Sequence, residues 1–375
     1  MFKKSLAIPC AVAAAIGASG WGIARADVPM PTVGGKIYAD ITNLDETSNG
    51  TKTAASGTGA DVKRFYLIVN ETFNSIWSAK LETDATYNSV KASTCTGSGA
   101  TLACTTSTTG QQVDVYMKNA WLQATLSQAF WVRLGESDMP WIPFDEGIYG
   151  NRYIENTLID RLHFGNSADW GLHVGGDLAG KALSYQVSVV NGAGYKNPTR
   201  SKSMDVEGRV DYTIDGLVFA LGGYSGKLGD DTYSATSPTT YHTANRFNAL
   251  AAYKGNGVTV GLEYFTANDW TTVTKTASDK ADGYSVFAQY DFTPMWNVFG
   301  RWDNAKTSKD LAPNLKDQYY NFGVDMKPLK NVDVALVYKH ETVNGGGFVN
   351  TSYGNIGGTV DGKVDEIGIW TQVAF

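Results

Sequence analysis

The strongest constraint on the fold is a two-residue alternation of apolar and polar side chains that recurs along almost the whole chain. Such alternation gives a β-strand two different faces. Each alternating segment is roughly ten residues long, which suits a tilted strand that crosses a bilayer. There are sixteen of these segments, at 33–42, 62–71, 75–84, 113–125, 129–137, 170–177, 182–191, 204–213, 216–225, 245–254, 257–266, 283–292, 295–304, 317–327, 331–340 and 364–375.

The connections between these segments alternate in length. The short ones are 72–74, 126–128, 177–181, 215–216, 255–256, 293–294 and 328–330, and the long ones are 43–61, 85–112, 138–169, 192–203, 226–244, 267–282, 305–316 and 341–363. Transmembrane barrels have short turns on one rim and longer loops on the other, whereas a soluble sandwich or a propeller has no reason to sort its loops in this way. We therefore predict an all-β fold: one transmembrane barrel of sixteen antiparallel strands, with both termini on the short-turn rim.

One local feature supports this prediction and another marks its least regular strand. All ten prolines fall outside the sixteen segments, as the hydrogen bonding of a strand ladder requires. Segment 113–125 is the least regular, because its alternation slips in phase around Met117–Trp121.

The two ends of the chain predict export and membrane insertion. Lys3 and Lys4 precede an uncharged run at 5–18, and Ala24 and Ala26 place small residues before a cleavage site, so we predict a signal peptide at 1–26 and a barrel domain at 27–375. The last strand alternates and stops on the aromatic Phe375. This ending resembles the C-terminal assembly signal of Gram-negative outer-membrane proteins, which implies a location in the outer membrane.

Charge and cysteine content narrow the possible partners. Without residues 1–26 the chain has 28 basic and 37 acidic residues, a net charge of −9, and it shows no basic stripe that would neutralise the phosphates of a nucleic acid. Cys95 and Cys104 lie in one Ser/Thr/Gly-rich stretch, and in an exported protein we expect a disulfide between them. The spacing and the absence of nearby histidines disfavour a metal site, and we expect no cofactor.

A barrel of sixteen strands encloses an aqueous channel rather than a packed core. The strand positions that alternate with the apolar residues carry charges of both signs, although each could also be read as an ordinary solvated surface charge. The predicted channel wall comprises Arg64, Lys80, Glu82, Arg133, Glu207, Arg209, Arg301 and Asp303, with Glu263, Asp291, Asp325 and Glu366 on the same parity.

The third long connection, 138–169, differs from the others because it is rich in large apolar residues, among them Trp141, Phe144, Tyr149 and Leu158. Such a segment must pack against something. We predict that it folds into the barrel and narrows the channel; the alternatives are that it caps the outer mouth or binds a neighbouring subunit. Its charged residues would then surround the narrowest point, and they are Asp138, Asp145, Glu146, Arg152, Glu155, Asp160 and Arg161. Five acids against two arginines suggest a weak preference for cations.

These features together resemble the trimeric general porins of Gram-negative bacteria. The run 143–147 followed by Asn156–Arg161 is more loosely similar to the phosphate-selective porins, although those carry basic clusters that this connection lacks. The resemblance implies a homotrimer in outer-membrane lipid that passes small hydrophilic solutes and ions.

Three classes of function remain open. The leading hypothesis is passive diffusion, with an anion- or phosphate-selective channel as the alternative. An outer-membrane enzyme is disfavoured because no local motif places a nucleophile beside His163, His173, His242 or His340. A barrel that surrounds an electron-transfer partner would need haem from another protein, because the chain has no Cys-x-x-Cys-His.

Overall fold

A computed structural model describes residues 30–96, 103–233, 240–345 and 361–375, and for 86–96 and 103–112 it describes the backbone alone. The predicted signal peptide lies outside the described residues. Within them, no helix is both long and apolar enough to cross a membrane.

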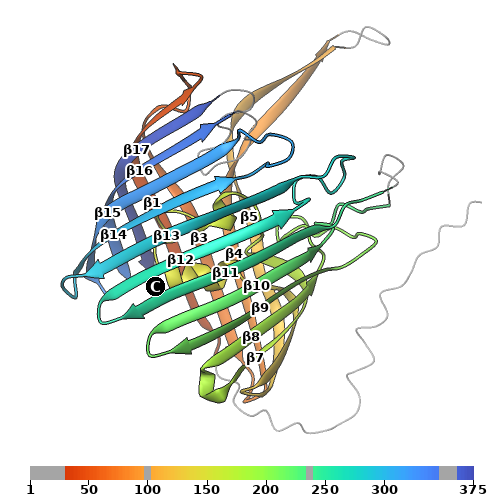
Figure 1. Cartoon of the computed structure of the whole chain (residues 1–375), viewed down its shortest axis with the longest axis vertical. Helices are drawn as coiled ribbons and strands as arrows, with labels where there is room; N and C mark the ends of the chain where they lie inside the picture. The colour runs from red at the N-terminus through yellow and green to blue at the C-terminus, as the bar shows by residue number, and fades with distance from the viewer. Residues whose placement is uncertain (1–29, 97–102, 234–239, 346–360) are drawn as a thin grey trace, which may run out of the picture.

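The strands form one closed antiparallel sheet (Figure 1). Closure is direct, because β1 pairs with β3 on one side and with β17 on the other. The strands are β1 (Thr32–Ser48), β2 (Thr51–Lys52), β3 (Gly57–Thr72), β4 (Trp77–Thr96), β5 (Ala103–Ser127), β6 (Phe130–Asp138), β7 (Ala168–Leu178), β8 (Leu183–Val190), β9 (Asp205–Ile214), β10 (Leu217–Gly226), β11 (Ala244–Gly255), β12 (Val258–Asn268), β13 (Lys280–Asp291), β14 (Trp296–Lys306), β15 (Lys316–Leu329), β16 (Val332–Asn344) and β17 (Gly362–Ala374). The two-residue β2 only extends the β1–β3 hairpin, so the predicted sixteen-stranded barrel is confirmed.

The start of β1 and the C-terminal end of the chain meet on the short-turn rim, where both ends of the barrel were predicted. The Gly35 amide donates to the Phe375 carbonyl at 2.9 Å, and the Phe375 amide donates back to the Gly35 carbonyl at 3.1 Å. The neighbouring Ala374 amide donates to the carbonyl of Asn331, which lies in the short turn between β15 and β16.

Several predicted boundaries were wrong. The predicted loop 43–61 is mostly strand, because β1 continues to Ser48 and β3 starts at Gly57. Most of the predicted loop 85–112 is strand, because β4 continues to Thr96 and β5 starts at Ala103. This stretch is rich in Thr, whose β-branched side chain favours strands, so the hairpin can continue beyond the predicted ends. Pro328 falls inside β15 rather than outside it, but it sits at a register irregularity between Met326 and Leu329, where no ladder donor is needed.

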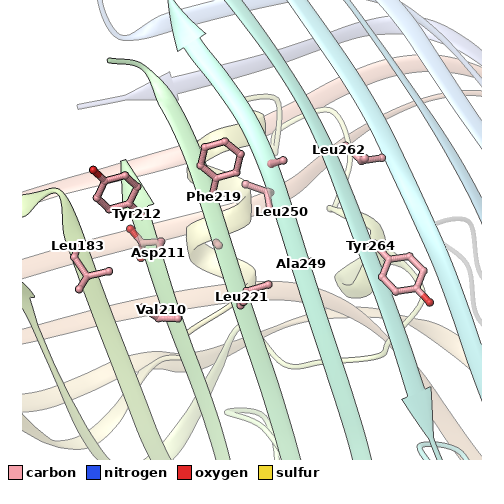
Figure 2. A pocket seen from close by; sticks show the side chains of 12 residues that line it. Leu183, Val210, Asp211, Tyr212, Phe219, Leu221, Ala249, Leu250, Leu262 and Tyr264 are labelled. Carbon is pink, nitrogen blue, oxygen red and sulfur yellow. The ribbon is translucent and has the colours of Figure 1, made fainter. Parts of the chain in front are cut away.

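The outward face of the barrel is apolar. Phe219 and Leu221 on β10 are about half exposed, whereas their neighbour Ala220 is buried. Beside them the small Ala249 and Ala251 of β11 leave a groove of about 530 Å³ between the larger outward residues of β10 and β12 (Figure 2). A water-soluble protein does not expose a surface of this kind on strand after strand, and such a face suits lipid.

In the described residues, three short helical segments interrupt the strands: α1 (Ile142–Tyr149), α2 (Leu158–Arg161) and the 3-10 turn η2 (Ala179–Lys181). Helix α1 has Pro143 in its first turn, where a proline removes no helical hydrogen bond. It ends at Gly150, whose φ of 81° is the left-handed conformation that glycine adopts without strain. Helices α1 and α2 both belong to the connection between β6 and β7.

Candidate functional site

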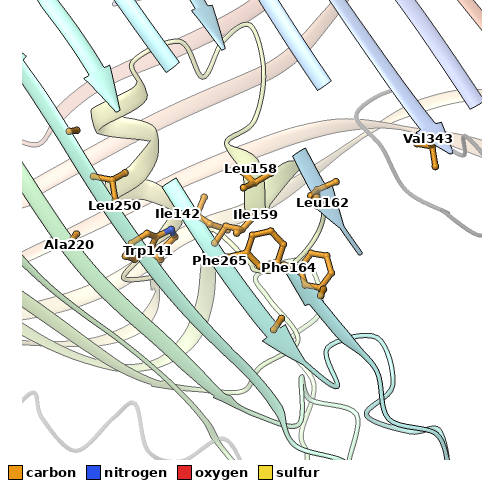
Figure 3. Close-up of a cluster of buried hydrophobic side chains, with 14 of the residues drawn as sticks. Trp141, Ile142, Leu158, Ile159, Leu162, Phe164, Ala220, Leu250, Phe265 and Val343 are labelled. Carbon is orange, nitrogen blue, oxygen red and sulfur yellow. The ribbon is translucent and has the colours of Figure 1, made fainter. Parts of the chain in front are cut away.

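The connection between β6 and β7 runs from 139 to 167, slightly shorter than predicted, and is here called the 139–167 segment. Its apolar side chains pack on strand residues that alternate with the outward apolar ones (Figure 3). Trp141 and Ile142 belong to one buried cluster with Ala220 of β10 and Leu250 of β11, and Phe164 lies 5.0 Å from Phe265 of β12 between ring centroids. The segment therefore contacts the charged face of the strands and not the lipid-type face.

Trp141 occupies a position that the strands are shaped to accept. Its backbone amide donates to Glu207 at 2.9 Å, and its indole Nε1 donates to Glu263 at 3.1 Å. The ring fills the space above Gly222 of β10, where a Cβ would collide with the indole. Glycine at this position therefore lets the segment lie close to the sheet.

Arg161 is fully buried and holds α2 to three strands. Its guanidinium donates to Asp303 at 3.2 Å, to Asp317 at 2.6 Å and to Glu341 at 2.5 Å. Its face also stacks on the ring of Tyr319, with 4.6 Å between Cζ and the centroid. Arg161 was predicted to line the constriction, but its side chain has no exposed surface, so it fixes the segment rather than meeting solutes.

Two predicted acids are buried as well. Glu155 pairs with Lys339 of β16 at 3.3 Å, and the same ammonium lies 3.5 Å from Glu366. Asp145 is 1% exposed. Burial, and then the neighbouring Glu263 carboxylate, raise the pKa of Asp145 well above its ordinary value, which favours the uncharged acid. The simple count of loop charges behind the expected cation preference therefore includes groups that do not face water.

The remaining charges of the segment border open space. Arg152 pairs with Glu146 and lies 3.6 Å from Asp160. Together with β3, β4, β5 and the connection after β8, this part of the segment bounds a hollow of about 210 Å³, here called the chamber. The charged residues that line the chamber are Arg64, Asp84, Lys118, Arg152, Asp160 and Lys196, with His163 beside them.

The predicted channel-wall residues are all on the strand face that the segment contacts, but they are engaged in different ways. Arg64 binds Asp84 at 2.8 Å, and Lys80 pairs with Glu82. Three arginines have other partners in the strands or in the segment. Arg133 lies between the rings of Trp121 and Trp131, Arg209 donates to the Pro140 carbonyl at 2.5 Å, and Arg301 binds Asp303 and the Asn156 carbonyl.

Some remaining predicted positions also make defined contacts. Asp138 ends β6 and accepts a hydrogen bond from the Asn119 amide at 3.1 Å. Glu207 binds Arg246 at 2.9 Å in addition to Trp141, and Asp325 accepts a bond from Tyr153 at 3.0 Å. The backbone register sets Cys95 opposite Cys104 in the β4–β5 ladder, but their side chains lie outside the part that is described. The disulfide stays a prediction.

The sequence analysis missed Lys118 and Lys196 as site residues. Strict alternation places Lys118 on the same face as the outward-facing Leu122, and only the phase slip at 117–121 signals its true position. Lys196 lies in the connection after β8, and nothing in the sequence pattern shows that this connection reaches the chamber.

No protein-family model and no curated protein matches the chain. Several solved structures share its fold at low sequence identity. The anion-selective porin from Comamonas acidovorans has a TM-score of 0.61 at 12% identity, with 92% of this chain and 99% of that chain covered. The channel DcaP of Acinetobacter baumannii has a TM-score of 0.59 at 11% identity, and OmpF of Salmonella typhi has a TM-score of 0.58 at 12% identity. Each comparison covers 92% of this chain and 97% of the other chain. The chain therefore has the fold of the Gram-negative outer-membrane porins.

Proposed function

We propose that the protein is an outer-membrane porin that lets small hydrophilic solutes and ions diffuse through a channel narrowed by the 139–167 segment. The observation that carries the proposal is the attachment of this segment to the charged face of the closed barrel by Trp141, Tyr153 and Arg161. A closed sixteen-stranded sheet has an interior too wide to be filled by its own strand side chains. A segment fixed against one wall reduces that width without closing it.

The proposed mechanism involves no covalent chemistry. The space left between the 139–167 segment and β3–β5 sets the size limit, and the fixed charges around it bias the passage of ions. The contacts of Arg161 and Lys339 keep the segment in place, because each ammonium or guanidinium group is held by two or more carboxylates. A rigid constriction is what a constant, ungated conductance requires.

Catalysis is the weaker alternative. His173 Nδ1 lies 2.7 Å from Ser188 Oγ, which is the spacing of a general base beside a nucleophile. Both residues are completely buried, however, so no substrate could reach the hydroxyl. We interpret this pair as a structural hydrogen bond within the β7–β8 hairpin.

We also propose that the protein is exported with residues 1–26 as a signal peptide and assembles as a homotrimer. One structure with the same fold is the trimer form of OmpT from Vibrio cholerae, with a TM-score of 0.58 at 12% identity, covering 92% of this chain and all of that one. Native mass spectrometry in mild detergent should give three times the mass of residues 27–375. A stable monomer under those conditions would contradict the assembly.

Planar-bilayer conductance tests the channel. The purified protein should form open pores, and replacing residues 143–160 with a short Gly-Ser linker should raise the single-channel conductance and admit larger polyethylene glycols. A matched control shortens the connection 346–360 by a similar length and should leave both quantities unchanged. A protein that inserts but does not conduct would overturn the proposed function, and an unchanged conductance after the 143–160 replacement would overturn the constriction.

A further inference from the structure

We infer that Lys118 and Lys196 form a binding site for small anions, with carboxylate or phosphate groups, in the chamber beside the 139–167 segment. This inference rests on the proposed function and gives it a solute class. It also reverses the cation preference expected from the charges of the connection alone.

A β-bulge brings Lys118 into the chamber. In the β4–β5 ladder Glu82 pairs with Asn119 and Thr83 pairs with Met117, so Lys118 has no partner residue. Met117 is 45% exposed on the outside and Asn119 is completely buried on the inside. The extra residue between them turns inward as well and lines the chamber. Bulges commonly redirect a side chain in this way beside a functional site.

In the described part of the chain, neither lysine has a carboxylate oxygen within the 4 Å of an ion pair. The Lys118 ammonium instead lies 5.0 Å from the ring centroid of Tyr66, and the Lys196 ammonium lies 4.9 Å from that of Tyr116 and 5.6 Å from that of Tyr195. Aromatic faces stabilise these cations but leave their positive charge uncompensated.

The acids near the two lysines are already engaged. Asp84 accepts hydrogen bonds from Arg64 at 2.8 Å and from the Tyr195 hydroxyl at 2.7 Å. Asp160 lies 3.6 Å from Arg152, which also pairs with Glu146. Glu82 and Asp138 also act electrostatically on Lys118, but Glu82 is paired with Lys80 and Asp138 accepts a hydrogen bond from the Asn119 side chain.

The charged side chains that line the chamber carry a net positive charge. The lining has the four cations Arg64, Lys118, Arg152 and Lys196 against two acids, and counting Glu146 behind Arg152 still leaves a net charge of +1. At a narrow place with low-dielectric walls, such a charge attracts anions far more strongly than a charge in open water would. Carboxylate and phosphate oxygens accept hydrogen bonds from two ammonium groups at once, and a volume of about 210 Å³ admits inorganic phosphate or a small dicarboxylate. Binding must stay weak enough for the solute to leave.

The test uses the purified full-length channel in planar bilayers. A KCl gradient should give a reversal potential that favours chloride, and added phosphate or succinate should reduce the chloride current in a saturable way. In the double variant Lys118→Gln with Lys196→Gln, the half-blocking concentration of the anion should rise at least about tenfold, which corresponds to about 1.4 kcal/mol of binding. The reversal potential of the double variant should shift toward potassium.

Lys254→Gln is the matched control, because Lys254 borders a separate hollow near the short turns and carries the same charge. It should change the half-blocking concentration by less than about twofold, and Lys118→Arg should retain the block. Block by phosphate but not succinate would assign the site to phosphate groups, and the reverse would assign it to carboxylates.

Potassium preference in the unmodified channel would overturn the inference, as would an unchanged anion block in a double variant that still inserts and conducts. A protein that inserts without conducting would instead overturn the proposed function itself.

Discussion

Replacing the buried arginine of α2 is the most demanding test of how the 139–167 segment is held. In Arg161→Met, Asp303 keeps Arg301 at 2.6 Å, but Asp317 and Glu341 lose their cation and remain buried on neighbouring strands. Breaking a buried ion pair by removing one partner typically costs about 3–5 kcal/mol, because the remaining charge is uncompensated. We expect a loss of that size in the free energy of unfolding.

The loss should show in two measurements. Urea unfolding in detergent should shift its midpoint to lower urea, and single-channel recordings should become noisy as the segment leaves the wall. The matched variant combines Arg161→Met with Asp317→Asn and Glu341→Gln, which removes the orphaned charges with little change in side-chain shape. This triple variant should recover most of the lost stability, since it leaves no uncompensated buried charge at positions 317 and 341. If Arg161→Met loses less than about 1 kcal/mol, or if the triple variant is no more stable than the single one, the arginine does not hold the segment by charge pairing.

Three further predictions concern other contacts of the same molecule. Asp145 has a raised pKa in the folded state, so its contribution to the free energy of unfolding is present at low pH and is lost as the pH rises above the ordinary range of an aspartate. In Asp145→Asn this pH-dependent loss of stability should disappear, as urea unfolding at several pH values will show. Gly222→Ala should destabilise the protein by about 1–3 kcal/mol by displacing the indole packed there, whereas Gly223→Ala, whose added Cβ would lie 3.6 Å from its nearest neighbour, should be tolerated in the same unfolding assay. Cys95 and Cys104 should resist thiol labelling until they are reduced, and losing their disulfide should cost about 2–3 kcal/mol; two thiols that react without reductant would refute the pairing.

The sequence by itself determined the barrel. Two-residue alternation and connection length are local properties, and in a closed antiparallel sheet they decide the number of strands, the rim on which the termini lie and the face that meets lipid. Segment 331–340 illustrates this, because strict alternation places Leu336 and Lys339 on opposite faces, and in β16 Leu336 is outside and Lys339 inside. The local pattern did not show where a strand stops outside the bilayer, since alternation alone sets no limit on the length of the β4–β5 hairpin.

Only the tertiary structure decided which charges can meet a solute. Arg161 and Glu341 are 180 positions apart in the sequence, and no spacing rule reveals that their side chains are paired and buried together. The sequence correctly singled out the connection after β6 as unusual, but it assigned equal roles to Arg152 and Arg161, of which one borders the chamber and the other is buried. Lys118 shows the opposite failure, because a single bulged residue moves a side chain from one face of a strand to the other. Strand patterns are fixed by neighbours two residues apart, whereas the charge that lines a channel depends on pairings across the whole barrel.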